Sequence, residues 1–182
     1  SMTIAQTIYK RVLKLMGNRF EISVVAAEQD TEFAEHAIDA AVEEIQRIEQ
    51  LLTTYREDSQ TIAVNLMAGI RPVQVDREFF DLVARSVRLS SLTQGAFDIT
   101  YGSIDKRLWN FDKTMTALPD PETARQMVKL INYRNIILDD EACTIFLKEP
   151  GMRIGFGGIG KGYAAEMARR VLRQVLNMAP RV

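Results

Sequence analysis

A glycine-rich stretch near the end of the chain limits its fold more than any other feature. Five of the ten glycines lie within residues 155–165, which read GFGGIGKGYAA. Residues 152–154 predict the end of a strand, and residues 166–176 predict a helix. A glycine-rich turn between a strand and a helix lets backbone N–H groups approach a ligand, and the helix N-terminus adds partial positive charge. The stretch therefore predicts a site for a phosphate or diphosphate group.

Three interpretations of this stretch compete. The spacing of Gly155, Gly157 and Gly160 matches the dinucleotide fingerprint, which also needs a following strand and an acidic residue about 20 positions further on. Gly160 and Lys161 resemble the end of a P-loop, but Gly162 stands where Ser or Thr binds Mg²⁺. In the third interpretation the glycines only allow a strand and a helix to pack closely. The stretch by itself leaves all three open.

Composition excludes several classes of protein. The 182 residues suit one domain or part of a larger one, and 47% hydrophobic residues can build a core. A net charge of −1 gives no electrostatic reason to bind nucleic acid or an anionic membrane. Cys143 is the only cysteine, so the chain cannot form an internal disulfide or a cysteine metal cluster; its apolar neighbours predict a buried thiol in a strand. The single histidine, His36, flanks the apolar face of a helical pattern, which predicts a solvated position.

The periodicity of apolar residues predicts an α+β fold with a mostly antiparallel sheet packed against several helices. Strands that pair as hairpins, with loops too short for repeated crossovers, indicate this class. We expect a single domain over residues 1–182. The expected strands are 7–15, 19–26, 71–75, 135–138 and 143–147, with a turn at 16–18. The expected helices are 31–55, 59–65, 77–92 and 121–130, with Asp76 and Asp120 as N-caps.

Four short motifs follow one another along the chain. They are Met16-Gly17-Asn18; Tyr55-x-x-Asp58-Ser59 with Asn65; Gly95-Ala96-Phe97-Asp98-Ile99-Thr100 with Gly102, Trp109 and Phe111; and Gly157-Gly158-Ile159-Gly160-Lys161-Gly162-Tyr163-Ala164. In this order they resemble the motifs MGT, YxxDS…N, GAFD[IV]TxGP…WGF and GGIAKGYA of the ApbE family, the FAD:protein FMN transferases. The resemblance spans residues 16–170 and is specific because the four motifs occur together.

The resemblance implies an activity, and it implies how much of the family's domain this chain contains. Family members move FMN from FAD to a threonine hydroxyl of a target protein, with Mg²⁺ at the diphosphate and AMP as the leaving group. Such chemistry depends mainly on positioning and charge neutralisation. The chain resembles the N-terminal half of an ApbE-like domain. The family continues for a comparable length, and that part carries a GGD-type motif and the Asp and Thr that complete the metal site. Two alternatives are a flavin-binding module without transferase activity and an interaction fragment without a ligand.

The resemblance also assigns site residues. The expected FAD contacts are Met16, Tyr55, Ala96, Phe97, Asp98, Gly157, Gly158, Lys161 and Tyr163. Asp98 and Lys161 are the expected catalytic residues, although Lys161 could instead cap neighbouring carbonyls. The carbonyl of Gly160, where the family has Ala, is the expected Mg²⁺ ligand. Asn18 replaces a family Thr, Ser103 a family Pro and Gly155 a family Asp.

Partners and location follow from the resemblance alone. The expected partner is a flavoprotein subunit that presents a threonine, and no nucleic acid is expected. A dimer could form through the surface that the rest of the domain covers in the family. Family members act in the periplasm or on the outer face of the cytoplasmic membrane, although no signal peptide is visible in this sequence.

Overall fold

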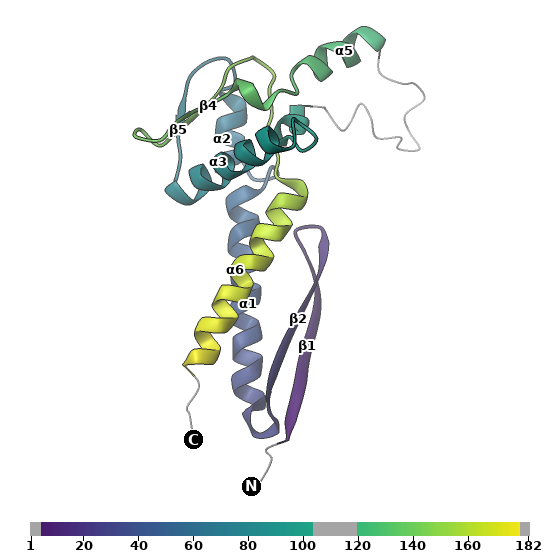
Figure 1. The fold of residues 1–182 in the computed structure, drawn as a ribbon, viewed down its shortest axis with the longest axis vertical. Helices are drawn as coiled ribbons and strands as arrows, with labels where there is room; N and C mark the ends of the chain where they lie inside the picture. The colour runs from purple at the N-terminus through teal and green to yellow at the C-terminus, as the bar shows by residue number, and fades with distance from the viewer. Residues whose placement is uncertain (1–4, 104–119, 179–182) are drawn as a thin grey trace. The chain divides into compact units, whose positions relative to one another are not determined.

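The computed structural model describes residues 5–103 and 120–178. The chain divides into two compact units (Figure 1). Unit 1 comprises Ser1–Gln50 and Gly158–Val182, and unit 2 comprises Leu51–Gly157. The assignment of one domain to the whole chain stays a prediction.

Unit 1 is a long hairpin beside two long helices. Strands β1 (Gln6–Leu15) and β2 (Asn18–Ala27) pair antiparallel, with Leu15 opposite Asn18. The 3-10 turn η1 (Glu28–Asp30) leads into α1 (Thr31–Leu52), and α6 (Gly157–Asn177) completes the unit. Both predicted strands are confirmed, and the predicted first helix ends at Leu52 rather than at Tyr55.

The core of unit 1 follows from strand alternation and helical spacing. Phe20, Ile22 and Val24 are buried on one face of β2, as the alternating pattern predicts. The helices contribute the buried residues Ala34, Ala37, Ile38, Ala41, Ile45, Ile48, Ala164 and Ala168. Arg11 lies opposite Ile22 on this same face of the hairpin, and its hydrogen bonds first to Asp39 and then to Glu35 raise the pKa of Arg11 above its ordinary value. These ion pairs hold β1 against α1.

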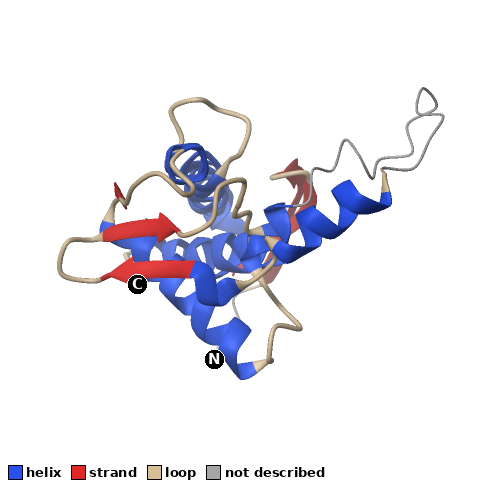
Figure 2. Cartoon of the chain, turned by 90° about the horizontal axis from the view of Figure 1, so that it is seen from above, coloured by secondary structure: helices blue, strands red, loops and turns tan. Residues whose placement is uncertain are grey.

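Unit 2 combines a small antiparallel sheet with helices. Strand β5 (Thr144–Leu147) lies between β3 (Val73–Gln74) and β4 (Ile136–Asp139) (Figure 2). Its helices and 3-10 turns are α2 (Gln60–Leu66), α3 (Arg77–Leu92), η2 (Ile99–Ser103), α5 (Pro121–Lys129) and η3 (Tyr133–Asn135). The predicted α+β class with antiparallel sheets is confirmed. Over the described residues, no helix is long and apolar enough to span a bilayer.

Two predicted helix caps behave differently. Asp120 caps α5 by accepting the N–H of Thr123 at 3.4 Å, ahead of Pro121 at the first helical position. Asp76 precedes α3, but its side chain does not cap the helix. Its carboxylate instead accepts a hydrogen bond from Gln60 Nε2 at 2.8 Å, while its backbone N–H donates to Gln60 Oε1 at 2.6 Å. Asp76 therefore links the start of α3 to the start of α2.

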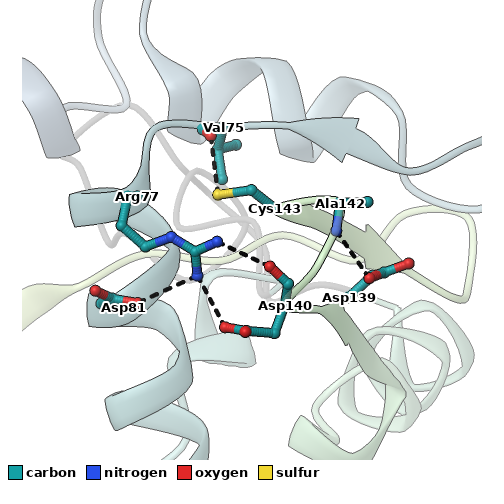
Figure 3. Close-up of polar contacts among 7 residues, drawn as sticks. All are labelled: Val75, Arg77, Asp81, Asp139, Asp140, Ala142 and Cys143. Atoms are coloured by element: carbon teal, nitrogen blue, oxygen red, sulfur yellow. Dashed lines mark hydrogen bonds and ion pairs between the residues drawn. The ribbon is translucent and has the colours of Figure 1, made fainter.

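Arg77 joins the start of α3 to the turn between β4 and β5 (Figure 3). Its guanidinium donates to the Asp140 side chain and to the Asp140 carbonyl, both at 2.8 Å, and the side-chain hydrogen bond raises the pKa of Arg77. In the same turn the Cys143 thiol donates to the Val75 carbonyl at 3.2 Å. The prediction that Cys143 is a buried strand residue is wrong, because it is half-buried and has a φ of +56° just before β5.

Candidate functional site

The glycine-rich stretch is mostly helix. Helix α6 begins at Gly157, and Gly157 has a φ of +50°. The prediction that residues 155–165 form a long turn is therefore wrong, as is the strand predicted at residues 152–154, whereas the helix predicted at residues 166–176 is confirmed as part of α6. Glycine weakens a helix by about 1 kcal/mol per residue relative to alanine. Gly160 and Ala164 are nevertheless buried on one face of α6, a packing that local sequence reasoning could not see.

Asn65 holds the segment that leads into α6. Its side-chain oxygen accepts the N–H of Ile154 at 2.8 Å, and its amide donates to the carbonyl of Ile154 at 3.1 Å. Asn65 thus pairs with Ile154 as a neighbouring strand would. Both residues are buried, and Arg153 reinforces the link by donating to the carbonyl of Asn65 at 3.0 Å. Residues 152–155 belong to no helix or sheet.

The turn η2 holds the other side of this segment. The Ser103 hydroxyl accepts the N–H of Arg153 at 2.9 Å and donates to its carbonyl at 3.2 Å. The N–H of Gly155 donates to the carbonyl of Ile99 at 3.0 Å. A Cβ on Gly102 would lie 2.9 Å from the carbonyl carbon of Ile154. Only glycine fits at this contact between two backbones.

Asp98 lies at the centre of the third motif and is 4% exposed. One carboxylate oxygen accepts the N–H of Thr100 at 2.8 Å and its hydroxyl at 2.6 Å, and the other accepts the N–H of Tyr133 at 2.9 Å. A carboxylate has about four acceptor positions, so one is left for a further donor. These bonds give Asp98 a firm place in the fold, and its predicted contact with FAD stays a prediction.

The neighbours of Asp98 are more open. Ala96 is exposed and Phe97 is half-buried, with the Phe97 N–H donating to the Thr93 hydroxyl at 3.2 Å. Tyr55 is 95% exposed. A hollow of about 410 Å³ adjoins Asp98 and is also lined by Tyr101 and Tyr133, among others. Tyr55, Ala96, Phe97 and Asp98 belong to unit 2. Trp109 and Phe111 lie outside the described residues.

Gly157 is the last residue of unit 2, and the remaining predicted contacts belong to unit 1. Gly158 is exposed, and Lys161 and Tyr163 are half-buried on α6. The Lys161 ammonium lies 5.7 Å from the centroid of the Phe20 ring, a cation–π contact that orients the side chain. Met16 lies in the β1–β2 turn of the same unit.

The described residues fit a metal ion only in part. Among residues 5–103 and 120–178, no three His, Cys, Asp or Glu side chains gather closely enough to hold one. Gly160 is buried in the first turn of α6. Its carbonyl bonds within the helix but keeps a second lone pair, so it could supply one Mg²⁺ ligand.

Comparison with known proteins settles the family. The model of the ApbE family matches residues 16–178. The chain belongs to the ApbE family. A relative from Klebsiella pneumoniae (strain 342), named FAD:protein FMN transferase, is 37% identical to this chain over 130 residues. A relative of the same name from Treponema pallidum (strain Nichols) is 31% identical over 144 residues. These alignments cover 71% and 74% of this ApbE chain but only 41% and 40% of the relatives.

Solved ApbE structures share the fold. The ApbE protein of Thermotoga maritima has a TM-score of 0.79 at 26% identity, over 93% of this chain and 53% of its own. The apo flavinyl transferase ApbE of Pseudomonas stutzeri has a TM-score of 0.78 at 22% identity, over 96% and 57%. This ApbE chain therefore spans about half the length of the relatives it matches.

Sequence reasoning misses the residues that hold the motifs in place. Asn65, Gly102 and Ser103 lie within motifs, but the sequence suggests no role for them. Phe20 is predicted only as a strand residue, and its contact with Lys161 joins positions far apart in the chain. The only feature of the sequence that points to these four residues is that they lie within or beside the motifs.

Proposed function

We propose that this chain is the flavin-binding part of an FAD:protein FMN transferase, which moves FMN from FAD to a threonine hydroxyl with Mg²⁺ and releases AMP. The match of the ApbE family model to residues 16–178 carries this proposal. The frame formed by Asn65 and Ser103 supports it, because this frame fixes the backbone that enters the glycine-rich start of α6. An exposed helix N-terminus without side chains at Gly157 and Gly158 suits a diphosphate.

The proposed reaction is one phosphoryl substitution. The threonine Oγ forms a bond to the phosphorus of the FMN moiety, and the bond from that phosphorus to the bridging oxygen of the diphosphate breaks. The bridging oxygen leaves with AMP, and the hydroxyl proton passes to a base. When bound, Mg²⁺ would neutralise the diphosphate charge. On this chain, Lys161 would contribute a positive charge oriented by Phe20, and the carbonyl of Gly160 would offer one metal ligand.

The alternative is a flavin-binding module that does not catalyse transfer. The lack of a three-residue metal cluster among the described residues favours it. Incubation of the chain with FAD, Mg²⁺ and a threonine peptide separates the two functions. Peptide flavinylation detected by mass spectrometry, together with AMP release, supports the transferase. Quenching of FAD fluorescence without AMP release supports the module, and the absence of both contradicts both functions.

Lys161→Gln tests the role of the α6 N-terminus. Loss of one charge–diphosphate contact should weaken FAD binding about tenfold, roughly 1.4 kcal/mol. Riboflavin, which has no phosphate, should bind as before. Lys148→Gln, at an exposed lysine of unit 2, is the matched control. Equal losses for FAD and riboflavin would show that Lys161 does not contact the diphosphate.

We also propose a partner and a location. The partner is a flavoprotein subunit that presents a threonine, and the protein acts on the outer side of the cytoplasmic membrane.

The proposed surface for self-association is the outer face of the hairpin, where Ile8, Val12 and Val25 are 60%, 52% and 55% exposed. Light scattering of the wild-type chain and of Val12→Lys tests the dimer, and cell fractionation of the native protein tests its location. A wild-type monomer at high concentration contradicts the dimer.

A further inference from the structure

The turn between β1 and β2 contains an unfavourable residue. Met16 and Gly17 are its two central residues, with φ values of +54° and +70°. Positive φ at both positions is typical of a type I′ turn, which matches the twist of paired strands and favours Asn or Gly. A long side chain rarely adopts this conformation. Met16 is therefore not the residue that turn closure alone would select.

Two side chains hold Met16 in this conformation. The half-buried Glu49 carboxylate on α1 accepts the backbone N–H of Met16 at 3.2 Å. From the other side, Asn18 Nδ2 donates to the Met16 carbonyl at 3.0 Å. Both backbone polar groups of one strained residue are thus bonded to side chains. All three residues belong to unit 1, and the turn closes the far end of the hairpin from the N-terminus (Figure 1).

Strain that is held by specific contacts indicates a use for the strained residue. We propose that Glu49 and Asn18 are positioning residues that hold Met16 in its left-handed conformation so that its thioether side chain can pack on FAD. This inference rests on the proposed function. It explains why the turn contains Met16 rather than Asn or Gly. It also gives a role to Glu49, which lies outside the four motifs.

The turn itself provides the first test. Met16→Asn places a residue suited to positive φ at this position, so the variant should melt at a higher temperature than the wild type. The same variant should bind FAD about tenfold more weakly, by fluorescence quenching, because it lacks the packing side chain. A variant that keeps wild-type FAD affinity would overturn the inference.

A double-mutant cycle tests the role of Glu49. Glu49→Ala should weaken FAD binding about fivefold in the wild-type background and have no effect in the Met16→Asn background, where no side chain needs positioning. Glu49→Gln keeps an oxygen that can accept the Met16 N–H and should retain wild-type affinity. Glu43→Ala, at an exposed carboxylate of α1, is the matched control.

The outcomes separate the two proposals. A wild-type chain that does not bind FAD contradicts the proposed function, and this inference with it. A wild-type chain that binds FAD, with the same Glu49→Ala effect in both backgrounds, contradicts only the inference, because a purely structural role gives equal effects. Melting temperatures of all variants report any general loss of folding.

Discussion

At the scale of single residues, the segment that enters α6 depends on the side-chain amide of Asn65, through both its carbonyl oxygen and its NH2 group. The side chain of Asn65 satisfies the N–H and the carbonyl of Ile154, which is 1% exposed. A buried backbone group left without a partner costs free energy, whereas its bonded state adds little net stability. This asymmetry makes Asn65 sensitive to truncation.

Asn65→Ala should therefore lower the free energy of unfolding by about 1–3 kcal/mol. Urea denaturation followed by circular dichroism measures this change. Asn177→Ala, at an exposed position of α6, is the control and should change stability by less than about 0.5 kcal/mol. If both variants unfold at the same urea concentration, water or a rearranged backbone satisfies Ile154 and the proposed frame is wrong.

Two glycines of the motifs should respond to alanine in opposite directions. A Cβ at Gly102 meets backbone atoms at 2.9 to 3.1 Å, so Gly102→Ala should cost about 1–3 kcal/mol. Gly162 lies inside α6, and a Cβ there would meet no atom within 4 Å apart from the helix's own backbone. Gly162→Ala should therefore stabilise the protein by up to about 1 kcal/mol. Thermal unfolding of the pair measures both effects. A stable Gly102→Ala variant would mean that the two backbones can separate easily.

At the scale of elements, α5 carries a local charge pair that can be titrated. Hydrogen bonds from Arg125 and then from Gln126 hold the pKa of Glu122 below its ordinary value. Because the folded pKa is depressed, the stabilisation is present above the unfolded pKa and is lost as pH falls through the folded pKa. Arg125→Met should raise the pKa of Glu122 toward its ordinary value. Carboxyl NMR titration measures this, and an unchanged titration would show that the exposed pair does not form in solution.

The helices also show which features sequence patterns can predict. The apolar spacing of α3 and the capping signal of α5 place both helices within a residue or two, because these signals are local. The start of α6 escapes prediction, because glycine propensity argues against helix and the burial of Gly160 and Ala164 in the fold leaves no local sequence pattern. Residue type predicts the Asp76 cap, but the side chain of Gln60 takes its hydrogen bonds instead.

At the scale of the molecule, the fold class and the family could be predicted, and the contacts that hold the site could not. Antiparallel pairing follows from short connections and alternating strands, as in β1 and β2. Four ordered motifs identify a family because together they sample most of the chain. The contact of Asn65 with Ile154 and that of Glu49 with Met16 join distant positions through one side chain each, and no periodicity encodes such contacts.

The division of the chain has a consequence for biosynthesis. Unit 2 is one continuous run, Leu51–Gly157, whereas unit 1 needs α6 as well as the first residues of the chain. A nascent protein leaves the ribosome N-terminus first, so unit 2 can fold while α6 is still in the exit tunnel. Limited proteolysis of ribosome-bound chains should therefore find unit 2 protected before the hairpin. Until α6 emerges, the contact of Lys161 with the Phe20 ring of β2 cannot form, although β2 was synthesised first.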